Sequence, residues 1–153
     1  MPDPIKILFI SDNFPPETNA AALRVYERAL YWKDWGYIPK IITSFPNRFK
    51  GKLHEGYSRA FYKKETLDNI EVIRVKTFVT KRGSFFLRSI HQLSFMVSSF
   101  FAGLFERKTN VIIATTPQFF CSFSGLLLSK IKKIPFILEV ADIWTDSIEI
   151  TIP

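Results

Sequence analysis

The sequence predicts an α/β fold, with a doubly wound, mostly parallel β-sheet that carries helices on both faces. Three short apolar runs, Ile5–Ile10, Val111–Thr115 and Phe136–Val140, are each followed by polar residues. Such runs, rich in β-branched residues, are typical of parallel strands buried on both faces. Segments with helical spacing of apolar residues alternate with them, which indicates βαβ units. A chain of 153 residues, 47% of them hydrophobic, can bury one core of this kind.

The first predicted strand, Ile5–Ile10, opens into an exposed loop that leads to a helix. Ser11-Asp12-Asn13 are turn-forming residues, and two prolines that follow exclude continued strand pairing. Thr18 or Asn19 can cap the helix, because a side-chain oxygen accepts the free N–H groups of the first turn. In an open α/β sheet this junction lies at the carboxyl end of the strand, where such folds bind ligands.

The helix after this loop is predicted from Asn19 to Trp35 and leads to a second strand, Ile38–Thr43. Its expected buried face consists of apolar residues at helical spacing, namely Ala22, Leu23, Tyr26, Ala29 and Leu30. Gly36 suits the left-handed conformation that often follows a helix. The segment is therefore a βαβ unit, for which a right-handed crossover is expected.

Residues 44–88 hold the whole excess of positive charge. They contain 11 Lys or Arg against four Asp or Glu, while the net charge of the chain is +7. Residues 44–69 are rich in loop-forming residues, and we expect 60–64 to pair with 70–77 around a turn at Leu67-Asp68-Asn69. Basic residues interleaved with aromatic ones suit a phosphate-rich partner, such as a pyrophosphate, an anionic membrane or nucleic acid. A face that serves only solubility is the alternative.

The segment 84–105 is the most apolar part of the chain and is predicted to be a core helix. Arg88, His91 and Gln92 interrupt the uncharged run, which disfavours a membrane-spanning helix. An interfacial helix that also touches a membrane remains an alternative. The charged residues 106–108 are expected to end this helix, and a further helix is expected over Gln118–Ile131.

Several familiar motifs are absent from the sequence. No Gly-x-Gly-x-x-Gly follows the first strand, and neither a Walker loop nor a Gly-x-Ser-x-Gly elbow occurs. With two His and a single Cys, neither a disulfide framework nor a transition-metal site is expected. No secretory signal is recognised either, so a cytoplasmic location is expected. The strand ends instead carry polar residues that should converge on one rim: Asp12, Glu17, Asn19, Thr116, Gln118, Glu139, Asp142 and Asp146.

A series of short segments has a distinctive order and spacing. They are Ile7–Asn13, Phe14–Glu17, Arg24-Val25, Trp35–Tyr37, Ser44–Asn47, Glu55–Tyr57, Ile73–Val75, Val111–Pro117 and Phe136–Ser147. Together they resemble the N-terminal domain of family 4 retaining glycosyltransferases of the GT-B fold. The resemblance runs through nearly the whole chain. It is nearest to bacterial transferases that build surface polysaccharide, O-antigen or capsule units.

The resemblance implies that residues 1–153 form a Rossmann-like, acceptor-side domain. The donor-binding C-terminal domain of the family, with its Glu-x7-Glu signature, is absent from this sequence, so the chain alone is expected to be inactive. The implied reaction is glycosyl transfer with retention and without a metal or other cofactor. A nucleotide-diphosphate sugar would be the donor and a saccharide linked to lipid diphosphate the acceptor. The implied location is peripheral, on the inner face of the cytoplasmic membrane.

The resemblance also suggests site residues. Asp142 is the catalytic candidate, as a contact to a hydroxyl group or to the donor. Candidates for donor or acceptor binding are Glu17, Asn19, Ala20, Arg24, Thr116, Gln118 and Trp144. Candidates for the acceptor phosphate or the membrane are Arg48, Lys50 and Lys52. Two positions depart from the family pattern, since Asn19-Ala20 replaces a Gly-Gly pair and Ala141 stands where relatives have Arg.

One competing interpretation is a non-catalytic Rossmann-like binding module. It would dock on an anionic membrane or on nucleic acid through the basic residues 44–88, whose Phe and Tyr side chains could stack on bases. Between these interpretations we favour the transferase, with no nucleic-acid partner.

Overall fold

The computed structural model describes residues 3–48, 52–53, 61–78, 85–116 and 119–141 of the chain. Its main sheet has six strands in the order β5-β6-β2-β1-β7-β8. Their bounds are β1 Lys6–Ile10, β2 Ile38–Ser44, β5 Tyr62–Leu67, β6 Ile70–Val75, β7 Val111–Thr115 and β8 Phe136–Glu139. The strands are parallel except for the edge strand β5, which runs antiparallel to β6. Two short strands, β3 (Asn47–Arg48) and β4 (Lys52–Leu53), pair separately.

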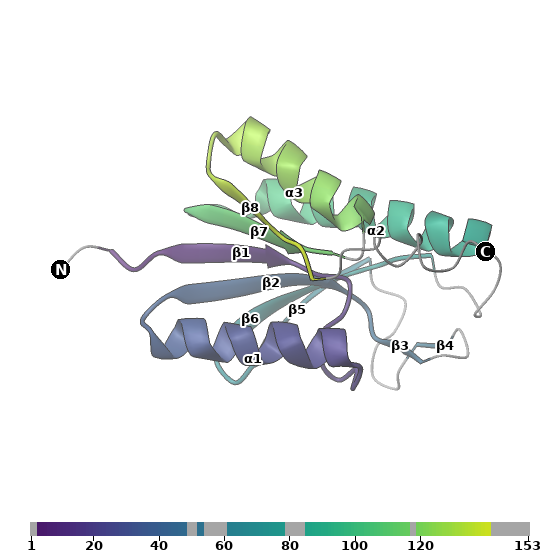
Figure 1. Cartoon of the computed structure of the whole chain (residues 1–153), viewed down its shortest axis with the longest axis horizontal. Coiled ribbons are helices and arrows are strands. Elements are labelled where there is room, and N and C mark those ends of the chain that lie inside the picture. Colours follow the sequence, from purple (N-terminus) through teal and green to yellow (C-terminus); the bar gives the residue numbers. More distant parts are fainter. Residues whose placement is uncertain (1–2, 49–51, 54–60, 79–84, 117–118, 142–153) are drawn as a thin grey trace, which may run out of the picture.

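Three helices cover the two faces of the main sheet (Figure 1). The helix α1 (Ala20–Asp34) lies on one face, and α2 (Phe85–Phe105) lies beside α3 (Phe119–Lys132) on the other. The chain moves outward from the central β1 through β2 to β6 and then returns to β7 on the opposite side of β1. The strand order therefore reverses between β1 and β7, and this confirms the predicted doubly wound, Rossmann-like α/β fold.

Alternation of side chains along the strands divides the core into two layers. Ile7 and Phe9 of β1 pack in the layer beneath α1, together with Val25 of that helix. Leu8 and Ile10 point to the other face and pack in the layer beneath α2 and α3. Because successive residues of a strand face opposite sides, an almost unbroken apolar run fills both layers.

The helix α1 begins as the sequence predicts, and its buried face differs from the prediction at one position. The Asn19 side chain accepts a hydrogen bond from the Ala22 backbone N–H at 2.8 Å, and Gly36 has a φ of +84°. The expectation that Leu23 lies on the buried face is wrong, because its side chain is 45% exposed. Ala22 and Ala29 are buried as expected, and Val25 is buried in addition. These smaller side chains let the helix approach the sheet closely.

The β5–β6 hairpin is confirmed with shifted ends. The two-residue turn is Asp68-Asn69, and both residues have positive φ, 48° and 62°. Such turns suit hairpins because their backbone twist matches that of the strands. Leu67 is consequently a strand residue paired with Ile70, rather than part of the turn, and the strand continues back to Tyr62.

The helix α2 confirms the helix predicted over 84–105, and it ends before the charged residues 106–108 as expected. Glu106, directly after the helix, is a charged residue and yet is buried, at 5% exposure. Its carboxylate accepts hydrogen bonds from Lys40 at 2.5 Å and from Lys64 at 2.8 Å. Among the described residues, no helix combines the length and apolar character needed to cross a membrane.

Candidate functional site

The candidate site is the edge of the sheet at which β1, β7 and β8 end. These three parallel strands are neighbours, so their carboxyl ends reach the same edge (Figure 1). Asp12 follows β1, Thr116 follows β7, and Glu139 closes β8. The predicted convergence on one rim is confirmed for these three residues. The rim lies at the point where the strand order reverses, which is where open α/β sheets bind ligands.

Asp12 is fixed at this rim through both its backbone and its side chain. Its carbonyl oxygen accepts hydrogen bonds from the hydroxyls of Thr43 at 3.1 Å and Ser44 at 2.8 Å, at the end of β2. Its carboxylate contacts Nε2 of His91, on α2, at 2.9 Å. The Nδ1 atom of His91 lies 2.9 Å from the carbonyl oxygen of Phe78. Asp12 therefore connects β1 with β2 and with α2.

His91 fits this environment as an imidazolium. Both of its ring nitrogens face acceptors, a carbonyl and a carboxylate, and only the protonated ring can donate to both. Burial by itself lowers the pKa of His91, but the hydrogen bond and charge of Asp12 outweigh it, with smaller contributions from the Phe78 carbonyl and the charge of Glu17. Together they raise the pKa of His91 to about 9.

The middle of the β1–α1 loop is held by a buried arginine. Arg74 on β6 is 1% exposed, and its guanidinium donates a hydrogen bond to the carbonyl oxygen of Pro15. The same group lies 5.8 Å from the centroid of the Phe14 ring and 2.7 Å from a carboxylate oxygen of Glu65. Phe14 is itself buried. Its ring packs in the core while Arg74 fixes the loop backbone beside it.

The end of the loop carries several of the predicted binding residues. Besides capping α1, Asn19 donates a hydrogen bond from Nδ2 to the Asn13 side chain at 3.1 Å. Glu17 and Asn19 are half-buried, whereas Ala20 and Arg24 in the first turns of α1 are exposed. The amino end of α1 therefore opens onto the rim. Such helix ends offer free N–H groups and a positive dipole to anionic ligands.

The other side of the rim is formed by the ends of β7 and β8. Thr116 accepts a hydrogen bond at its hydroxyl from the Ala141 backbone N–H at 2.9 Å, and its own N–H donates to the Glu139 carbonyl at 2.9 Å. The Glu139 carboxylate forms an ion pair with Arg28 of α1. This pair ties α1 to the outer strand of the sheet. Thr116 is consequently held in place by contacts within the rim.

The remaining predicted site residues are not placed by the structure. Lys50, Gln118, Asp142, Trp144 and also Asp146 lie outside the described residues. The backbones of Arg48 and Lys52 pair between β3 and β4, but their side chains are not described. Their roles therefore stay predictions.

Three residues of the rim were missed by sequence reasoning, namely His91, Arg74 and Arg28. Each contacts a partner on an element that is distant along the chain, so no local pattern identifies it. One signal was available for Arg74, because it is a charged residue inside an otherwise alternating strand. It occupies a buried position, and buried charges are normally paired.

The chemistry available at the described part of the rim is that of hydrogen bonding and charge. Within the described ranges, no cluster of three His, Cys, Asp or Glu side chains could hold a metal ion. Cys121 lies near Ile10, with Sγ 3.5 Å from its carbonyl oxygen. Burial raises the pKa of the Cys121 thiol well above its usual value, helped by the charge of Asp12, so this thiol is a poor nucleophile at neutral pH.

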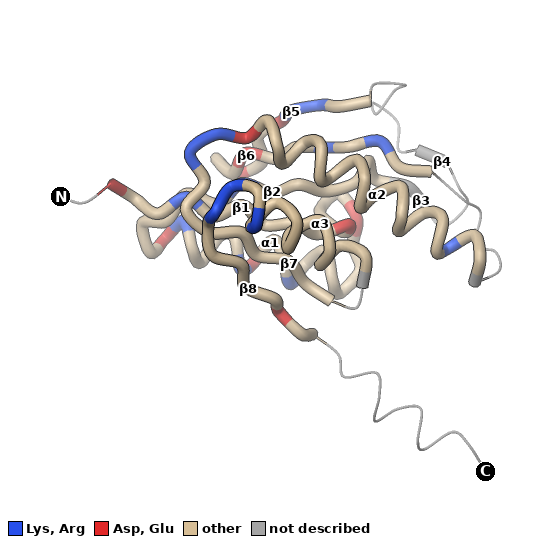
Figure 2. The backbone as a smooth tube through the Cα atoms, turned by 90° about the horizontal axis from the view of Figure 1, so that it is seen from above, with Lys and Arg blue, Asp and Glu red and all other residues tan. Residues whose placement is uncertain are grey.

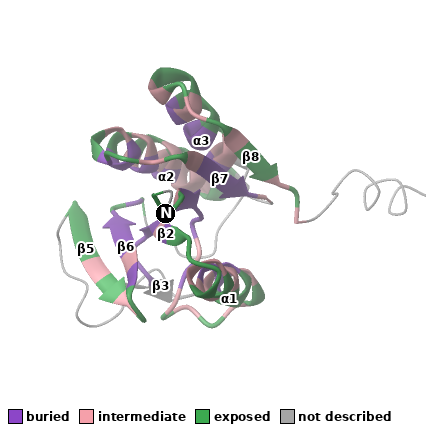
Figure 3. Cartoon of the chain, turned by 90° about the vertical axis from the view of Figure 1, so that its left-hand side faces the viewer, coloured by how far each residue is buried: buried purple, intermediate pink, exposed green. Residues whose placement is uncertain are grey.

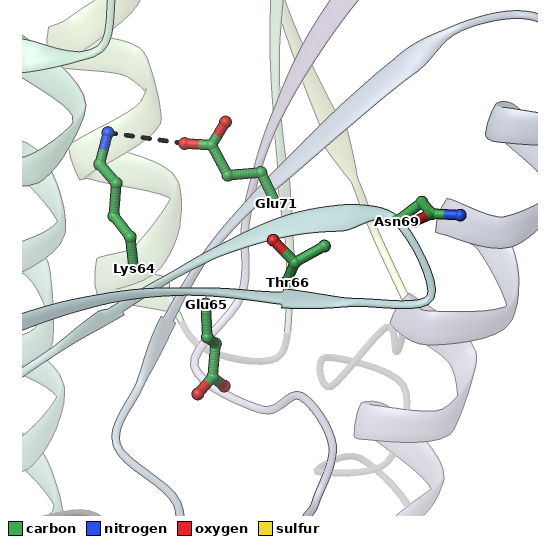
Figure 4. A pocket seen from close by; sticks show the side chains of 5 residues that line it. All are labelled: Lys64, Glu65, Thr66, Asn69 and Glu71. Carbon is green, nitrogen blue, oxygen red and sulfur yellow. Dashed lines mark ion pairs between the residues drawn. The ribbon is translucent and has the colours of Figure 1, made fainter.

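A shallow depression on the β5–β6 hairpin lies away from this rim. It has a volume of about 350 Å³ and is lined by Lys64, Glu65, Thr66, Asn69 and Glu71. Figure 4 shows Lys64 and Glu65 extending to opposite sides of the hairpin, with Lys64 paired to Glu71. Lys64 also binds the buried Glu106. These charges serve the packing of the edge strand.

Comparison with known proteins gives one relative in sequence and two in structure. No family model matches the chain. It is 30% identical over 145 residues, or 94% of its length, to WcaI of Escherichia coli strain K12, which is named a colanic acid biosynthesis glycosyl transferase. The chain spans 35% of the length of that relative.

The structural relatives share the fold. The catalytic domain of starch synthase IV from Arabidopsis thaliana, bound to ADP and acarbose, superposes with a TM-score of 0.65 at 12% identity. The match covers 90% of this chain and 34% of that one. The C-terminal domain of a hydrogenase from Pyrococcus furiosus superposes with a TM-score of 0.51 at 15% identity, over 90% and 96% of the two chains. A starch synthase and a hydrogenase have unrelated activities, so the fold alone does not select a function.

Proposed function

We propose that this chain is the acceptor-side domain of a glycosyltransferase of bacterial surface-polysaccharide synthesis. The observation that carries the proposal is the 30% identity to WcaI, because it extends over 94% of the chain. A shared fold at 12% identity adds only that the architecture suits such an enzyme. The donor nucleotide sugar would be held mainly by a second domain, and the 153 residues alone would not transfer sugar.

In this proposal the rim faces the reacting sugars. Glu17, Asn19 and Thr116 offer half-buried polar groups there, and the exposed amino end of α1, with Ala20 and Arg24, suits the phosphate side of the donor. Asp142 would contact a hydroxyl group or the donor, and Trp144 would stack on a sugar ring. Gln118 belongs to the same proposed site.

The proposed acceptor is a saccharide linked to lipid diphosphate. Arg48, Lys50 and Lys52 lie in the basic segment 44–88 and would neutralise its pyrophosphate. Such an acceptor is reached at the inner face of the cytoplasmic membrane, which gives the protein a peripheral location. The proposed reaction retains the anomeric configuration and uses no metal, with the leaving nucleotide diphosphate stabilised by protein groups.

The test is a titration of the isotope-labelled chain followed by amide NMR spectra. A detergent-solubilised, lipid-linked saccharide should shift the amide signals of residues 11–14, 17–20 and Thr116, whereas the same lipid phosphate without sugar should shift them much less. A nucleotide sugar should bind weakly, because its main site is expected in the other domain. Unchanged rim signals at saturating acceptor would contradict the proposal. Tight, salt-sensitive binding of a single-stranded oligonucleotide would instead favour the binding-module alternative.

A further inference from the structure

His91 contacts both the β1–α1 loop and the segment that follows β6. Its Nε2 atom lies 2.9 Å from a carboxylate oxygen of Asp12, and its Nδ1 atom lies 2.9 Å from the carbonyl oxygen of Phe78. The side chains of His91 and Asp12 are 18% and 9% exposed. Figure 3 shows α1 on one side of the buried strands and α2 with α3 on the other. His91 therefore reaches the rim from the side of the sheet opposite α1.

The contact with Asp12 continues along the loop to the amino end of α1. Asn13 follows Asp12 directly, and its side-chain oxygen accepts a hydrogen bond from Nδ2 of Asn19 at 3.1 Å. The side-chain oxygen of Asn19 in turn accepts from the Ala22 backbone N–H at 2.8 Å, in the first turn of the helix. A continuous series of contacts thus connects His91 with the loop and with the start of α1.

The contact with Phe78 belongs to a set that holds the segment after β6 on α2. The Phe78 backbone N–H donates to the Ser94 hydroxyl at 2.8 Å, and the Ser98 hydroxyl donates to the Lys76 carbonyl at 2.7 Å. These two bonds do not involve the His91 ring, so they persist when the ring is altered. Altering the ring should therefore displace the β1–α1 loop relative to α2, while the segment after β6 stays on the helix.

A charged ring is needed for both contacts of His91. An imidazolium donates from both nitrogens, whereas a neutral imidazole donates from one and presents a lone pair at the other. The negative charges of Asp12 and Glu17, both in the loop, favour the charged ring. The Cys121 thiol of α3 is affected by the same Asp12 charge, but burial raises its pKa well above its usual value and keeps it protonated.

We propose that His91 is a positioning residue of the rim, which as an imidazolium holds the β1–α1 loop in the arrangement that binds the saccharide acceptor. The inference rests on the proposed function, because Glu17, Asn19 and Ala20 of this loop belong to the proposed site. His91 acts through Asp12 and not on the reacting atoms, since both of its ring nitrogens already contact protein acceptors.

The test compares His91→Gln with a variant that keeps the charge and with a matched control. His91→Arg retains a positive charge and several N–H donors. The control is Arg88→Gln, because Arg88 is exposed and lies one turn before His91. Arg88 is also the one Lys, Arg, Asp or Glu in the sequence of α2, and Figure 2 shows the rest of that helix without such residues. Thermal melting checks that each variant is folded.

The first measurement is a pH titration of the labelled 153-residue chain without ligand, followed by carbon-detected NMR spectra. The chain has two His, so the ring signal that His91→Gln removes is that of His91. This signal and the backbone carbonyl carbons of Asn13, Asn19 and Phe78 should shift together at about pH 9, the pKa of His91. Both His91 variants should lack this shared titration, and Arg88→Gln should keep it. Loop carbonyl signals that do not follow the ring would overturn the proposal.

The second measurement is binding of a detergent-solubilised, lipid-linked saccharide at neutral pH. His91→Gln should weaken binding about tenfold, the value expected when roughly one molecule in ten keeps the wild-type loop arrangement. His91→Arg should recover part of the affinity, and Arg88→Gln should bind as the wild type does. Equal affinity of wild type and His91→Gln would overturn the proposal. If the saccharide binds none of these chains, the proposed function fails, and the ligand-free titration still decides whether His91 positions the loop.

Discussion

At the residue scale, the loop between β1 and α1 is positioned by side chains from distant parts of the sequence. His91 of α2 pairs with Asp12, and Arg74 of β6 binds the Pro15 carbonyl. Neither contact follows from local sequence, since each depends on which strands and helices become neighbours. What the sequence does predict here is local: the Asn19 cap and the left-handed Gly36 are both confirmed.

His91→Gln should remove a pH-dependent part of the stability. The pKa of His91 in the folded protein is raised to about 9, above the ordinary value of 6.5. The stabilisation is therefore fully present below pH 6.5 and is lost as the pH rises through about 9. The free energy of unfolding, from urea titrations, should differ between wild type and variant by up to about 3 kcal/mol at pH 6.

The difference in the free energy of unfolding between wild type and His91→Gln should shrink towards zero above pH 9. Asp12→Asn should show a similar pH profile, and the double variant should lose little more than either single variant. A difference between wild type and His91→Gln that is constant from pH 6 to pH 10 would show that the Asp12–His91 pair is not charged.

At the scale of elements, periodicity predicts which segments form strands and helices better than it predicts their orientation. Apolar runs predicted β1, β7 and β8 to within a residue or two. Strands β1 and β7 are buried on both faces as expected, but the expectation is wrong for the edge strand β8, where Ile137 and Leu138 are 51% and 44% exposed. The prediction for the buried face of α1 was wrong at Leu23, since Val25 packs against the sheet beside the expected Ala22 and Ala29. The burial of Glu106 was not predicted, because its partners Lys40 and Lys64 lie on β2 and β5, which are distant along the chain.

Glu106→Gln should destabilise the packing of the end of α2 against the sheet. Burial raises the pKa of the Glu106 carboxyl, but the hydrogen bonds and charges of Lys40 and Lys64 outweigh burial and lower it overall. The variant should lose about 1–3 kcal/mol of unfolding free energy at pH 7, because two lysines lose their shared partner. Arg107→Gln, at the next and exposed position, is the control and should change the stability by less than about 0.5 kcal/mol.

The stability contributed by Glu106 and its two lysine partners depends on pH in the opposite direction to that contributed by His91. A carboxyl with a lowered pKa contributes stability above its ordinary pKa, and that contribution is lost as the pH falls through the lowered value. Wild type and Glu106→Gln should therefore become more similar in strongly acidic solution. Equal unfolding free energies at pH 7 would mean that the ion pairs contribute nothing.

At the scale of the whole molecule, fold and function rest on different observations. The doubly wound sheet places Asp12, Thr116 and Glu139 at one edge, and this placement was predictable because parallel strands end together. The fold is shared with a starch synthase and with a hydrogenase, so the function is proposed from sequence identity to WcaI.

The most direct test of the central proposal is sugar transfer by the product of the complete reading frame that encodes these residues. Transfer from labelled nucleotide sugars to lipid-linked saccharides is measured for that product and for the 153 residues alone. We predict that the complete product transfers sugar and that the 153 residues alone do not. In the complete product, Asp142→Ala should lower the transfer rate at least about a hundredfold without a change in melting temperature. Transfer by the 153 residues alone, or a folded complete product that transfers no sugar, would contradict the proposal.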